Sequence, residues 1–221
     1  MKNSYLFLSA FLLGSTITKA QVLTAAEILE KSIEYHDPDG MWSSFNAKFN
    51  FRETRPNGPD RISSAEIDNN RGWFKMNRND EEIHGMLLDS CFLISGKADC
   101  SRAEVMRNYY LYLWGLPMKL KDEGTQLDRE YTVESYEGKE CYKLRVPYAE
   151  DIWYFYVTQD EFEMIAYSFY KDEEKGKGEL ITLDGVYQFN NMKIPNNRTW
   201  YELPGKRVLG TDILESAEKL N

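Results

Sequence analysis

The stretch "NYYLYLWGLPMKLKDEG" (residues 108–124) stands out in an acidic chain of 221 residues, because its run YYLYLW (109–114) carries no charge. The preceding "SRAE" (101–104) has the form of a capping box, in which a Ser hydroxyl and a Glu carboxylate each accept from a free backbone N–H group. The Gly-Leu-Pro that follows Trp114 is a helix stop signal. Together these signals predict a helix over 102–114.

This predicted helix has no polar side over 109–114. A helix at a protein surface has one apolar stripe, so a helix that is apolar almost all round belongs in an interior. Each tyrosine ring buries apolar area while its hydroxyl needs a hydrogen-bond partner. The run therefore predicts either packed core or the lining of an apolar binding site, and both interpretations stay open at this point.

Most of the remaining chain alternates with a period of two. Phe45, Ala47, Phe49 and Phe51 alternate with polar residues, which is typical of a half-buried strand. One further helix is predicted over 25–36, with a capping box at its start and "HDPDG" at its end. The short connections favour one antiparallel meander of short strands. The expected strands lie at 45–52, 62–68, 73–78, 83–88, 91–95, 130–135, 140–146, 151–157, 162–170, 178–188, 192–203 and 206–214.

Two of these strands are apolar on both faces. In "DIWYFYV" (151–157), Trp153 and Phe155 point one way while Tyr154 points the other way, and 162–169 has the same pattern. A strand with two apolar faces must be covered on both. The apolar helix can supply one cover, and the other is either packed core or a cavity.

Residues 1–20 have the form of a secretory signal peptide. Lys2 gives a positive start, residues 5–13 are apolar, and cleavage after the small residue Ala20 is expected. The apolar run is shorter than the about 20 residues that span a bilayer, and no Cys follows it that could carry a lipid. We therefore predict one mature domain, 21–221, in the periplasm or secreted, with no integral membrane segment.

Charge excludes two classes of partner. Loss of residues 1–20 removes Lys2 and Lys19 and no acid, so the net charge of −9 becomes −11. An acidic chain without a basic run is poorly suited to nucleic acid, where phosphate neutralisation by Lys and Arg dominates affinity. It is equally poorly suited to the surface of anionic lipid.

The sequence shows no catalytic pattern. It has no G-x-S-x-G elbow, no H-E-x-x-H, no P-loop and no dinucleotide glycine fingerprint. His36 lies in "HDPDG" (36–40), where the imidazole and two carboxylates could resemble metal ligands, but the stretch is turn chemistry at a helix end, and a His in the last turn favours the helix dipole. His84 is interpreted as a satisfied strand residue. We predict no catalytic residue, no metal site and no cofactor.

Three cysteines follow the signal peptide. Cys91 and Cys100 flank the predicted turn "SGK" (95–97) and could form a disulfide in an oxidising compartment, which would leave Cys141 as a free thiol. Three buried thiols are an equally good interpretation, because sequence does not supply the geometry.

Four motifs in this order resemble an uncharacterised family of secreted bacterial proteins. They are "EYHDPDG" (34–40, followed by Trp and Phe), "NYYLYLWGLPMKLKDEGT" (108–125), "DIWYFY" (151–156) and "LGTDIL" (209–214). The resemblance covers essentially the whole mature chain. Its order of elements looks like the LolA/LolB superfamily of lipoprotein carriers, which implies a half-open barrel that holds acyl chains in a cavity closed by helices.

We therefore predict an α+β fold, in which a strongly curved antiparallel sheet carries helix 25–36 outside or across one end and helix 102–114 in or over its concave face. The predicted function is non-enzymatic binding of an apolar small molecule, lipid or lipoprotein. A protein-interaction module in envelope assembly or stress sensing, and an uncharacterised hydrolase, are the alternatives. The predicted ligand-binding residues are Tyr109, Tyr110, Leu113, Trp114, Leu116, Met118, Trp153 and Phe155.

Overall fold

The computed structural model describes residues 22–220, so the predicted signal peptide at 1–20 lies outside the described residues. Within these residues the chain forms twelve strands, and each of them overlaps one of the expected ranges. They are β1 (Asn46–Thr54), β2 (Arg61–Asp68), β3 (Trp73–Arg78), β4 (Glu82–Leu87), β5 (Ser90–Ser95), β6 (Thr132–Tyr136), β7 (Lys139–Pro147), β8 (Ile152–Thr158), β9 (Met164–Asp172), β10 (Lys177–Phe189), β11 (Met192–Leu203) and β12 (Arg207–Lys219).

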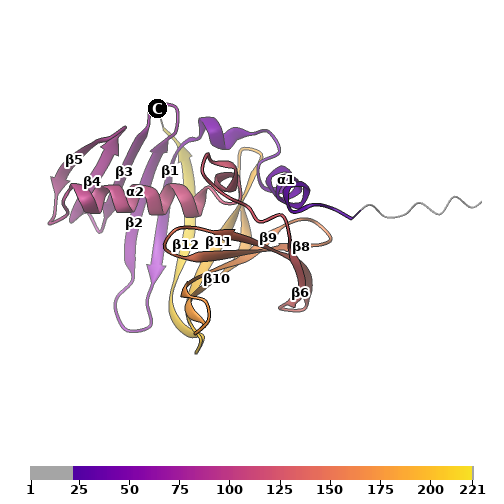
Figure 1. Cartoon of the computed structure of the whole chain (residues 1–221). Helices are drawn as coiled ribbons and strands as arrows, with labels where there is room; N and C mark the ends of the chain where they lie inside the picture. The colour runs from indigo at the N-terminus through magenta and orange to yellow at the C-terminus, as the bar shows by residue number, and fades with distance from the viewer. Residues whose placement is uncertain (1–21, 221) are drawn as a thin grey trace, which may run out of the picture.

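All twelve strands belong to one sheet with the order β5-β4-β3-β2-β1-β12-β11-β10-β9-β8-β7-β6, and every neighbouring pair is antiparallel. The meander is interrupted once, where β12 returns to pair with β1. The sheet curls around one face, and its end strands β5 and β6 do not meet (Figure 1). The predicted strongly curved, half-open barrel is therefore confirmed.

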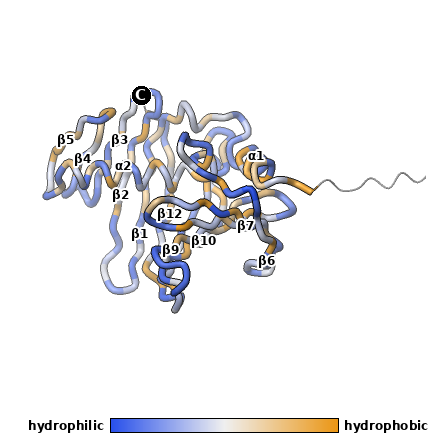
Figure 2. Tube along the Cα trace, viewed as in Figure 1, coloured by the Kyte–Doolittle hydropathy of each residue, from blue (hydrophilic) through white to orange (hydrophobic). Residues whose placement is uncertain are grey.

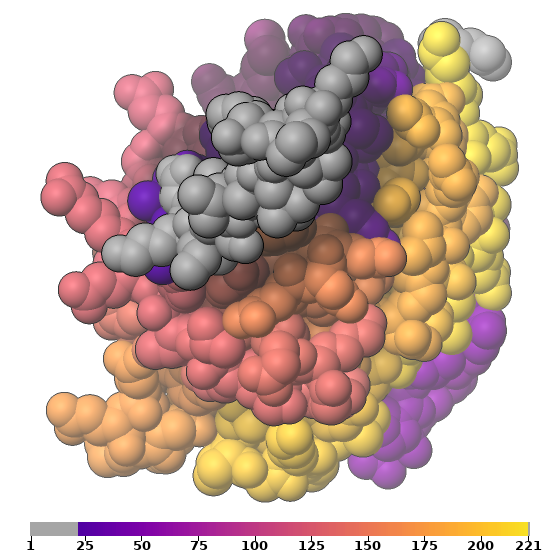
Figure 3. All heavy atoms as spheres, turned by 90° about the vertical axis from the view of Figure 1, so that its right-hand side faces the viewer, coloured from indigo at the N-terminus to yellow at the C-terminus, as the bar shows by residue number. Residues whose placement is uncertain are grey.

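Helix α1 (Ala25–His36) begins as the sequence predicts. The backbone N–H of Glu27 donates to the Thr24 hydroxyl at 3.2 Å, and the N–H of Thr24 donates to the Glu27 carboxylate at 2.8 Å. Ile28 and Leu29 are buried on its inner side. The helix packs against β11, and it lies on the side of the molecule that faces the viewer in Figure 3.

Helix α2 (Cys100–Trp114) begins earlier than predicted. The predicted cap was Ser101, but the carboxylate of Asp99 accepts from the N–H of Arg102 at 2.8 Å. The helix lies over the concave face, against β3, β4 and β5 (Figure 1). Only Ala103 and Met106 are buried in its first half, whereas no residue between 109 and 120 is exposed. The helix is therefore surrounded by other residues only in its second half, which contains the apolar run.

The main core lies between the concave face and α2. The Trp114 ring packs on Phe51, with ring centres 4.5 Å apart, and on Phe49 at 5.6 Å. Tyr110, one turn earlier, packs on Phe51 at 5.5 Å. Along the strands, hydrophobic and hydrophilic residues alternate rather than forming long blocks, as Figure 2 shows. No helix within residues 22–220 has the length and hydropathy needed to cross a membrane.

Both faces of β8 are covered, as its two apolar sides require. Trp153 and Phe155 face the main core, together with the ring of Tyr167 from β9. Tyr156 faces the opposite side, where it forms a second, smaller cluster with Cys141. The other buried members of that cluster are Ile165, Ala166 and Leu180. The face of β8 that carries Tyr156 is therefore covered by packed side chains of the second cluster. The face that carries Trp153 is the concave one.

A disulfide joins Cys91 of β5 to Cys100 at the start of α2, with Cα atoms 5.5 Å apart, and Cys141 is a buried free thiol. The bond holds the more exposed half of α2 against the edge of the sheet. Since closing a short loop removes conformational freedom from the unfolded chain, the Cys91→Ser/Cys100→Ser double variant should lose about 2–3 kcal/mol of unfolding free energy. Urea unfolding of the oxidised proteins measures the difference, and an unchanged midpoint would contradict the bond.

Candidate functional site

The eight predicted site residues all belong to, or pack on, the main core, but they differ in their access to solvent. Tyr110, Leu113, Trp114, Leu116 and Phe155 are at most 4% exposed and fill the interior. Tyr109, Met118 and Trp153 are half-buried. The structure therefore brings the predicted residues together, and only the second group keeps surface that another molecule could reach.

Half-buried aromatic rings gather at one end of the concave face. We call them the aromatic rim: Tyr109, Tyr112, Tyr148, Trp153, Phe169 and Trp200. The strand register places them at the same end, because Trp153 pairs with Phe169, which pairs with Glu179 at the start of β10. Glu179 in turn pairs with Glu202, two residues after Trp200. The β9–β10 and β11–β12 turns lie at this end of the sheet.

One half of the aromatic rim is built around Trp153. Its ring stacks on Phe169 with centres 4.8 Å apart, and the edge of Tyr112 meets it at 5.3 Å. The hydroxyls of Tyr112 and Tyr148 share a hydrogen bond of 2.8 Å, and the indole N–H of Trp153 donates to Asp151 at 2.7 Å. Every polar tip of this group has a partner, so the ring faces are the surface that remains for an apolar contact.

The other half of the aromatic rim lies over Asp212. Tyr109 stacks on Trp200 with centres 5.8 Å apart. The Tyr109 hydroxyl and the Trp200 indole N–H both donate to Oδ2 of Asp212, at 3.2 Å and 2.9 Å. Burial raises the pKa of the Asp212 carboxyl, and nearby Glu53 raises it further. Burial also raises the pKa of Tyr109 well above its usual value, so this hydroxyl stays protonated and keeps donating.

Two pockets open beside the aromatic rim. One has a volume of about 240 Å³, and its lining includes Tyr109, Trp200 and Asp212 together with Arg55 and Arg61. The other, of about 520 Å³, adjoins Phe169 and is otherwise lined mainly by residues of the two nearby turns. The rim is thus reached from solvent on both sides.

A third pocket lies at the other end of the sheet. It has a volume of about 470 Å³, with Met41, Phe45 and Phe189 as its apolar walls and Lys219 at its edge. Phe45 is buried and packs on Phe189 with ring centres 5.8 Å apart. A pocket with apolar lining residues therefore lies at each end of the concave face.

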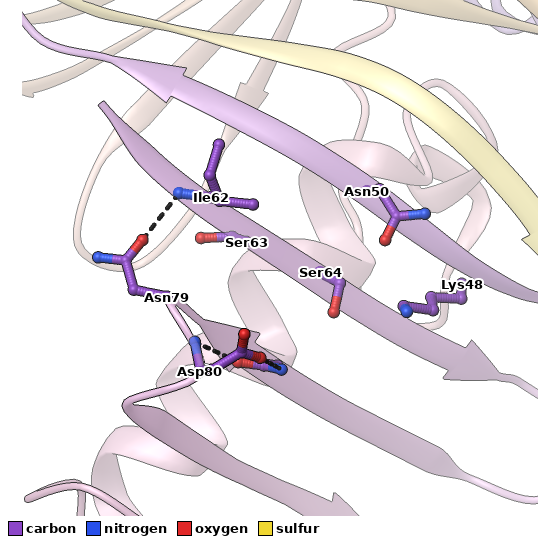
Figure 4. Close-up of a pocket in the computed structure, with 8 residues that line it drawn as sticks. Lys48, Asn50, Ile62, Ser63, Ser64, Asn79 and Asp80 are labelled. Atoms are coloured by element: carbon purple, nitrogen blue, oxygen red, sulfur yellow. Dashed lines mark hydrogen bonds between the residues drawn. The ribbon is translucent and has the colours of Figure 1, made fainter. Parts of the chain in front are cut away.

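A further pocket, of about 420 Å³, is chemically different (Figure 4). It lies on the convex face, because Asn50, Ser64 and Asn77 alternate with the core residues of β1, β2 and β3. The amide of Asn79 accepts from the N–H of Ile62 at 2.9 Å, and Asn77 bonds to Asp80 in the same turn. These polar side chains are used by the β3–β4 turn and by the strands, so we do not place the site here.

A row of buried charges crosses the concave floor, and sequence reasoning missed it. Glu53 accepts from the Tyr110 hydroxyl at 3.0 Å and forms ion pairs with Arg61 at 2.7 Å and Arg78 at 3.4 Å. Arg198 is 1% exposed. A signal was present in the sequence, because Arg198 has the same strand parity as the core residue Ile194.

Arg198 holds the end of α2 on the sheet. Its guanidinium carbon lies 3.4 Å from the centre of the Trp114 ring, and its terminal nitrogens donate to the carbonyls of Leu113 at 3.3 Å and Pro195 at 3.1 Å. Burial lowers the pKa of Arg198. A cation at the C-terminal carbonyls of a helix is favourable, and the planar group also stacks on the indole. Together with Glu53, it positions the second half of α2.

The two histidines are also placed by the fold. The ring Nδ1 of His36 donates to the carbonyl of Lys193 at 2.8 Å, and Nε2 accepts from the N–H of Met164 at 3.0 Å. His84 is fully buried, with Nε2 at 3.1 Å from Glu82. Within residues 22–220, no three His, Cys, Asp or Glu side chains are grouped so that they could hold a metal ion.

The curled sheet with a helix over its concave face is the architecture of LolA-like proteins. A LolA superfamily protein from Nitrosomonas europaea is 13% identical, with a TM-score of 0.51 over 90% of this chain and 95% of that one. A domain described as an outer membrane lipoprotein-sorting protein, from Vibrio parahaemolyticus, is 10% identical, with a TM-score of 0.55 over 87% and 92%. A DUF1329 family protein from Desulfovibrio piger is 9% identical, with a TM-score of 0.52 over 87% and 91%.

These similarities show the fold alone. The chain itself belongs to the family of unknown function DUF6503, whose model matches residues 2–90 and 85–216. No curated protein matches the chain. The resemblance to an uncharacterised, LolA-like family is thereby confirmed.

Proposed function

We propose that this protein is a non-enzymatic carrier or binding protein that takes an acyl chain, a lipid or a lipoprotein on the concave face of its sheet. The observation that carries the proposal is the aromatic rim: six rings that remain half-buried at one end of that face. Pockets that bind small molecules are concave and mainly apolar, with a few placed polar groups. The rim has this composition.

The rim also explains how the predicted residues divide. Trp153 and Tyr109 contact solvent, while Phe155 and Trp114 lie behind them and are 0% and 2% exposed. We infer that the ligand's apolar part lies against the rim and that the residues behind it support the rings. The lipoprotein-sorting description of the Vibrio domain and the LolA-like fold agree with an apolar cargo.

The second half of α2 is unsuited to swinging away on its own, since Arg198 and Glu53 both hold it to the floor. We infer that the ligand reaches the aromatic rim through the two pockets beside it, and that it does not pass through the packed core. We also propose that the mature protein acts in the periplasm or outside the cell, since residues 1–20 have the form of a secretory signal peptide.

Trp153→Ala tests the proposal. The substitution removes one of the two indole rings of the rim, so we expect the affinity for a fluorescent fatty acid to fall by about tenfold or more, which corresponds to about 1.4 kcal/mol or more. Tyr154→Ala is the matched control, because Tyr154 is on the opposite face of the same strand and packs on the second cluster. Its affinity should stay within about twofold of the wild type.

Circular dichroism establishes that both variants are folded. Native mass spectrometry of the wild type, purified from an envelope fraction, should show a bound lipid or acylated mass. A wild type that ignores the probe and carries no such mass would overturn the proposed function, and equal losses in both variants would move the site off the concave face.

A further inference from the structure

The pocket of about 240 Å³ beside the aromatic rim combines an apolar wall with two cations. Tyr109 and Trp200 belong both to the rim and to this pocket, whereas Arg55 and Arg61 belong to the pocket and not to the rim. A water molecule takes up about 30 Å³ in the liquid, so the pocket has room for a carboxylate or a phosphate group. The pocket is therefore continuous with the rim but chemically different from it.

Arg55 is held in this pocket without being neutralised. Its Nε and Nη2 atoms donate to the carbonyl of Pro59, in the turn between β1 and β2, at 3.3 Å and 2.7 Å. An arginine carries five N–H donors, and these bonds use two of them. Arg55 belongs to none of the ion pairs formed within residues 22–220. Its charge and its remaining donors are thus available to a ligand.

Arg61 is held from beneath. Its Nη2 atom pairs with Glu53 at 2.7 Å, and Glu53 is 4% exposed. The Nε atom of Arg61 is buried and has no hydrogen-bond partner among residues 22–220. Glu53 also pairs with Arg78 at 3.4 Å, so this carboxylate is shared between two guanidinium groups. The fold therefore fixes Arg61 in place and leaves part of its charge and of its donor set unused.

The charge around this pocket is opposite in sign to that of the whole chain, which has 27 basic and 36 acidic residues. Four arginines and only two carboxylates line the pocket or interact with the charges that do: Arg55, Arg61, Arg78 and Arg198, with Glu53 and Asp212. A hollow lined by one sign of charge concentrates the field there and attracts the opposite charge. An acidic protein thus has a locally positive pocket at the aromatic rim.

Asp212 lines the pocket but neutralises neither Arg55 nor Arg61. Its Oδ2 atom accepts from the Tyr109 hydroxyl and from the Trp200 indole N–H, at 3.2 Å and 2.9 Å. No ion pair of the described part of the chain contains it. Burial raises the pKa of this carboxyl, so it is charged less readily than an exposed aspartate. The carboxylate therefore orients the rings and leaves the guanidinium groups to a ligand.

We propose that this pocket, called the anion pocket below, binds the anionic headgroup of an amphiphile whose apolar part lies against the aromatic rim. The planar guanidinium matches the oxygens of a carboxylate or of a phosphate, and either group is the headgroup chemistry that Arg55 and Arg61 would recognise. The inference rests on the proposed function and narrows its ligand to an amphiphile that carries one of these two groups. Since Tyr109 and Trp200 belong to both surfaces, headgroup and chain bind side by side.

Four probes separate the headgroup from the chain. Decanoate and decyl phosphate carry an anion on an alkyl chain, decanol has the same chain length without a charge, and inorganic phosphate has the anion without a chain. Isothermal titration calorimetry of the oxidised protein at neutral pH measures the dissociation constant of each. We expect decyl phosphate to bind about tenfold or more tightly than inorganic phosphate, because the aromatic rim adds an apolar contact.

Arg55→Gln tests the anion pocket, because Gln removes the cation and keeps an amide that can donate to Pro59. The dissociation constants of decanoate and decyl phosphate should rise by about fivefold or more, while that of decanol stays within about twofold of the wild type. Arg52→Gln is the matched control, since it makes the same change in net charge on the same strand. Arg52 alternates with the buried residues of β1 and pairs with Glu215 at 2.8 Å, so all four constants should stay within about twofold.

Circular dichroism shows that each variant is folded. An unchanged constant for decanoate in Arg55→Gln, or equal losses for decanoate and decanol, overturns the anion pocket and leaves the proposed function standing. Inorganic phosphate that binds as tightly as decyl phosphate would make the pocket a site for free anions, which also overturns the inference. A wild type that binds none of the three alkyl probes, decanol included, overturns the proposed function itself.

Discussion

Replacing Trp114 with Ala should lower the free energy of unfolding by about 3–5 kcal/mol, because the substitution leaves a large cavity in a packed core. The Trp114 side chain is 2% exposed and contacts the rings of Phe49 and Phe51. Its ring face also receives the guanidinium of Arg198 at 3.4 Å. Removing the ring therefore leaves a buried cation with less compensation, which adds to the cost of the cavity. Urea unfolding at neutral pH measures the difference.

The control for this variant lies on the same helix. Val105 is 53% exposed, so Val105→Ala should change the unfolding free energy by less than about 0.5 kcal/mol. A loss of less than about 1 kcal/mol for Trp114→Ala would mean that the ring does not fill the space between α2 and the sheet. The comparison separates core packing from the helix propensity of either residue.

Much of the fold could be predicted from periodicity. The alternation that begins at Phe45 and the capping box at Thr24 are local signals, and the structure places β1 and α1 within a residue or two of the expected ranges. The two-faced strand 151–157 carried the strongest tertiary information, since two apolar faces require two covers. Both covers exist, and each is packed.

The start of α2 could not be predicted from local signals alone. Asp99 and Ser101 are both good capping residues, and "SRAE" also fits the capping-box pattern. The structure selects Asp99, and the disulfide at Cys100 holds the first turn against β5. Local signals allow either residue to cap the helix, and the choice between them goes with the contact of Cys100 with β5, which cannot be read from the sequence.

The candidate site was predicted in part. The sequence pointed to the aromatic run and to Trp153, because apolar residues must be covered somewhere. It did not point to Tyr148, Phe169 or Trp200, which join the aromatic rim only through the strand register. Buried Arg198 was missed because its partners, two carbonyls and an indole face, come from distant segments.

His36 is a second place where a local interpretation was wrong. A histidine in the last turn of a helix was expected to favour the helix dipole, which requires its protonated form. The structure instead buries His36, at 3% exposed, and uses both ring nitrogens for backbone groups of β9 and β11. The Nε2 atom accepts the N–H of Met164, which only a neutral ring can do. Tertiary burial outweighs the dipole.

This geometry makes the fold sensitive to acid. Burial lowers the pKa of His36 to about 4 from its usual 6.5. Because the folded-state pKa lies below the unfolded one, the stabilisation is full above about pH 6.5 and is lost as the pH falls toward 4. A shift of this size corresponds to about 3 kcal/mol, so the unfolding free energy should fall by about that amount between pH 7 and pH 4 through this residue alone.

The His36→Gln variant isolates that contribution from the carboxylates that titrate in the same range. Gln does not ionise, so the variant should be less stable than the wild type at pH 7, and the difference between them should shrink by about 3 kcal/mol by pH 4. Urea unfolding at half-unit pH steps measures both curves, and the NMR shift of the His36 ring should stay that of a neutral imidazole down to about pH 5. A difference that stays constant across this window would mean that His36 protonates freely in the folded state. In that case the bond from Met164 could not hold α1 to β9 as the structure has it.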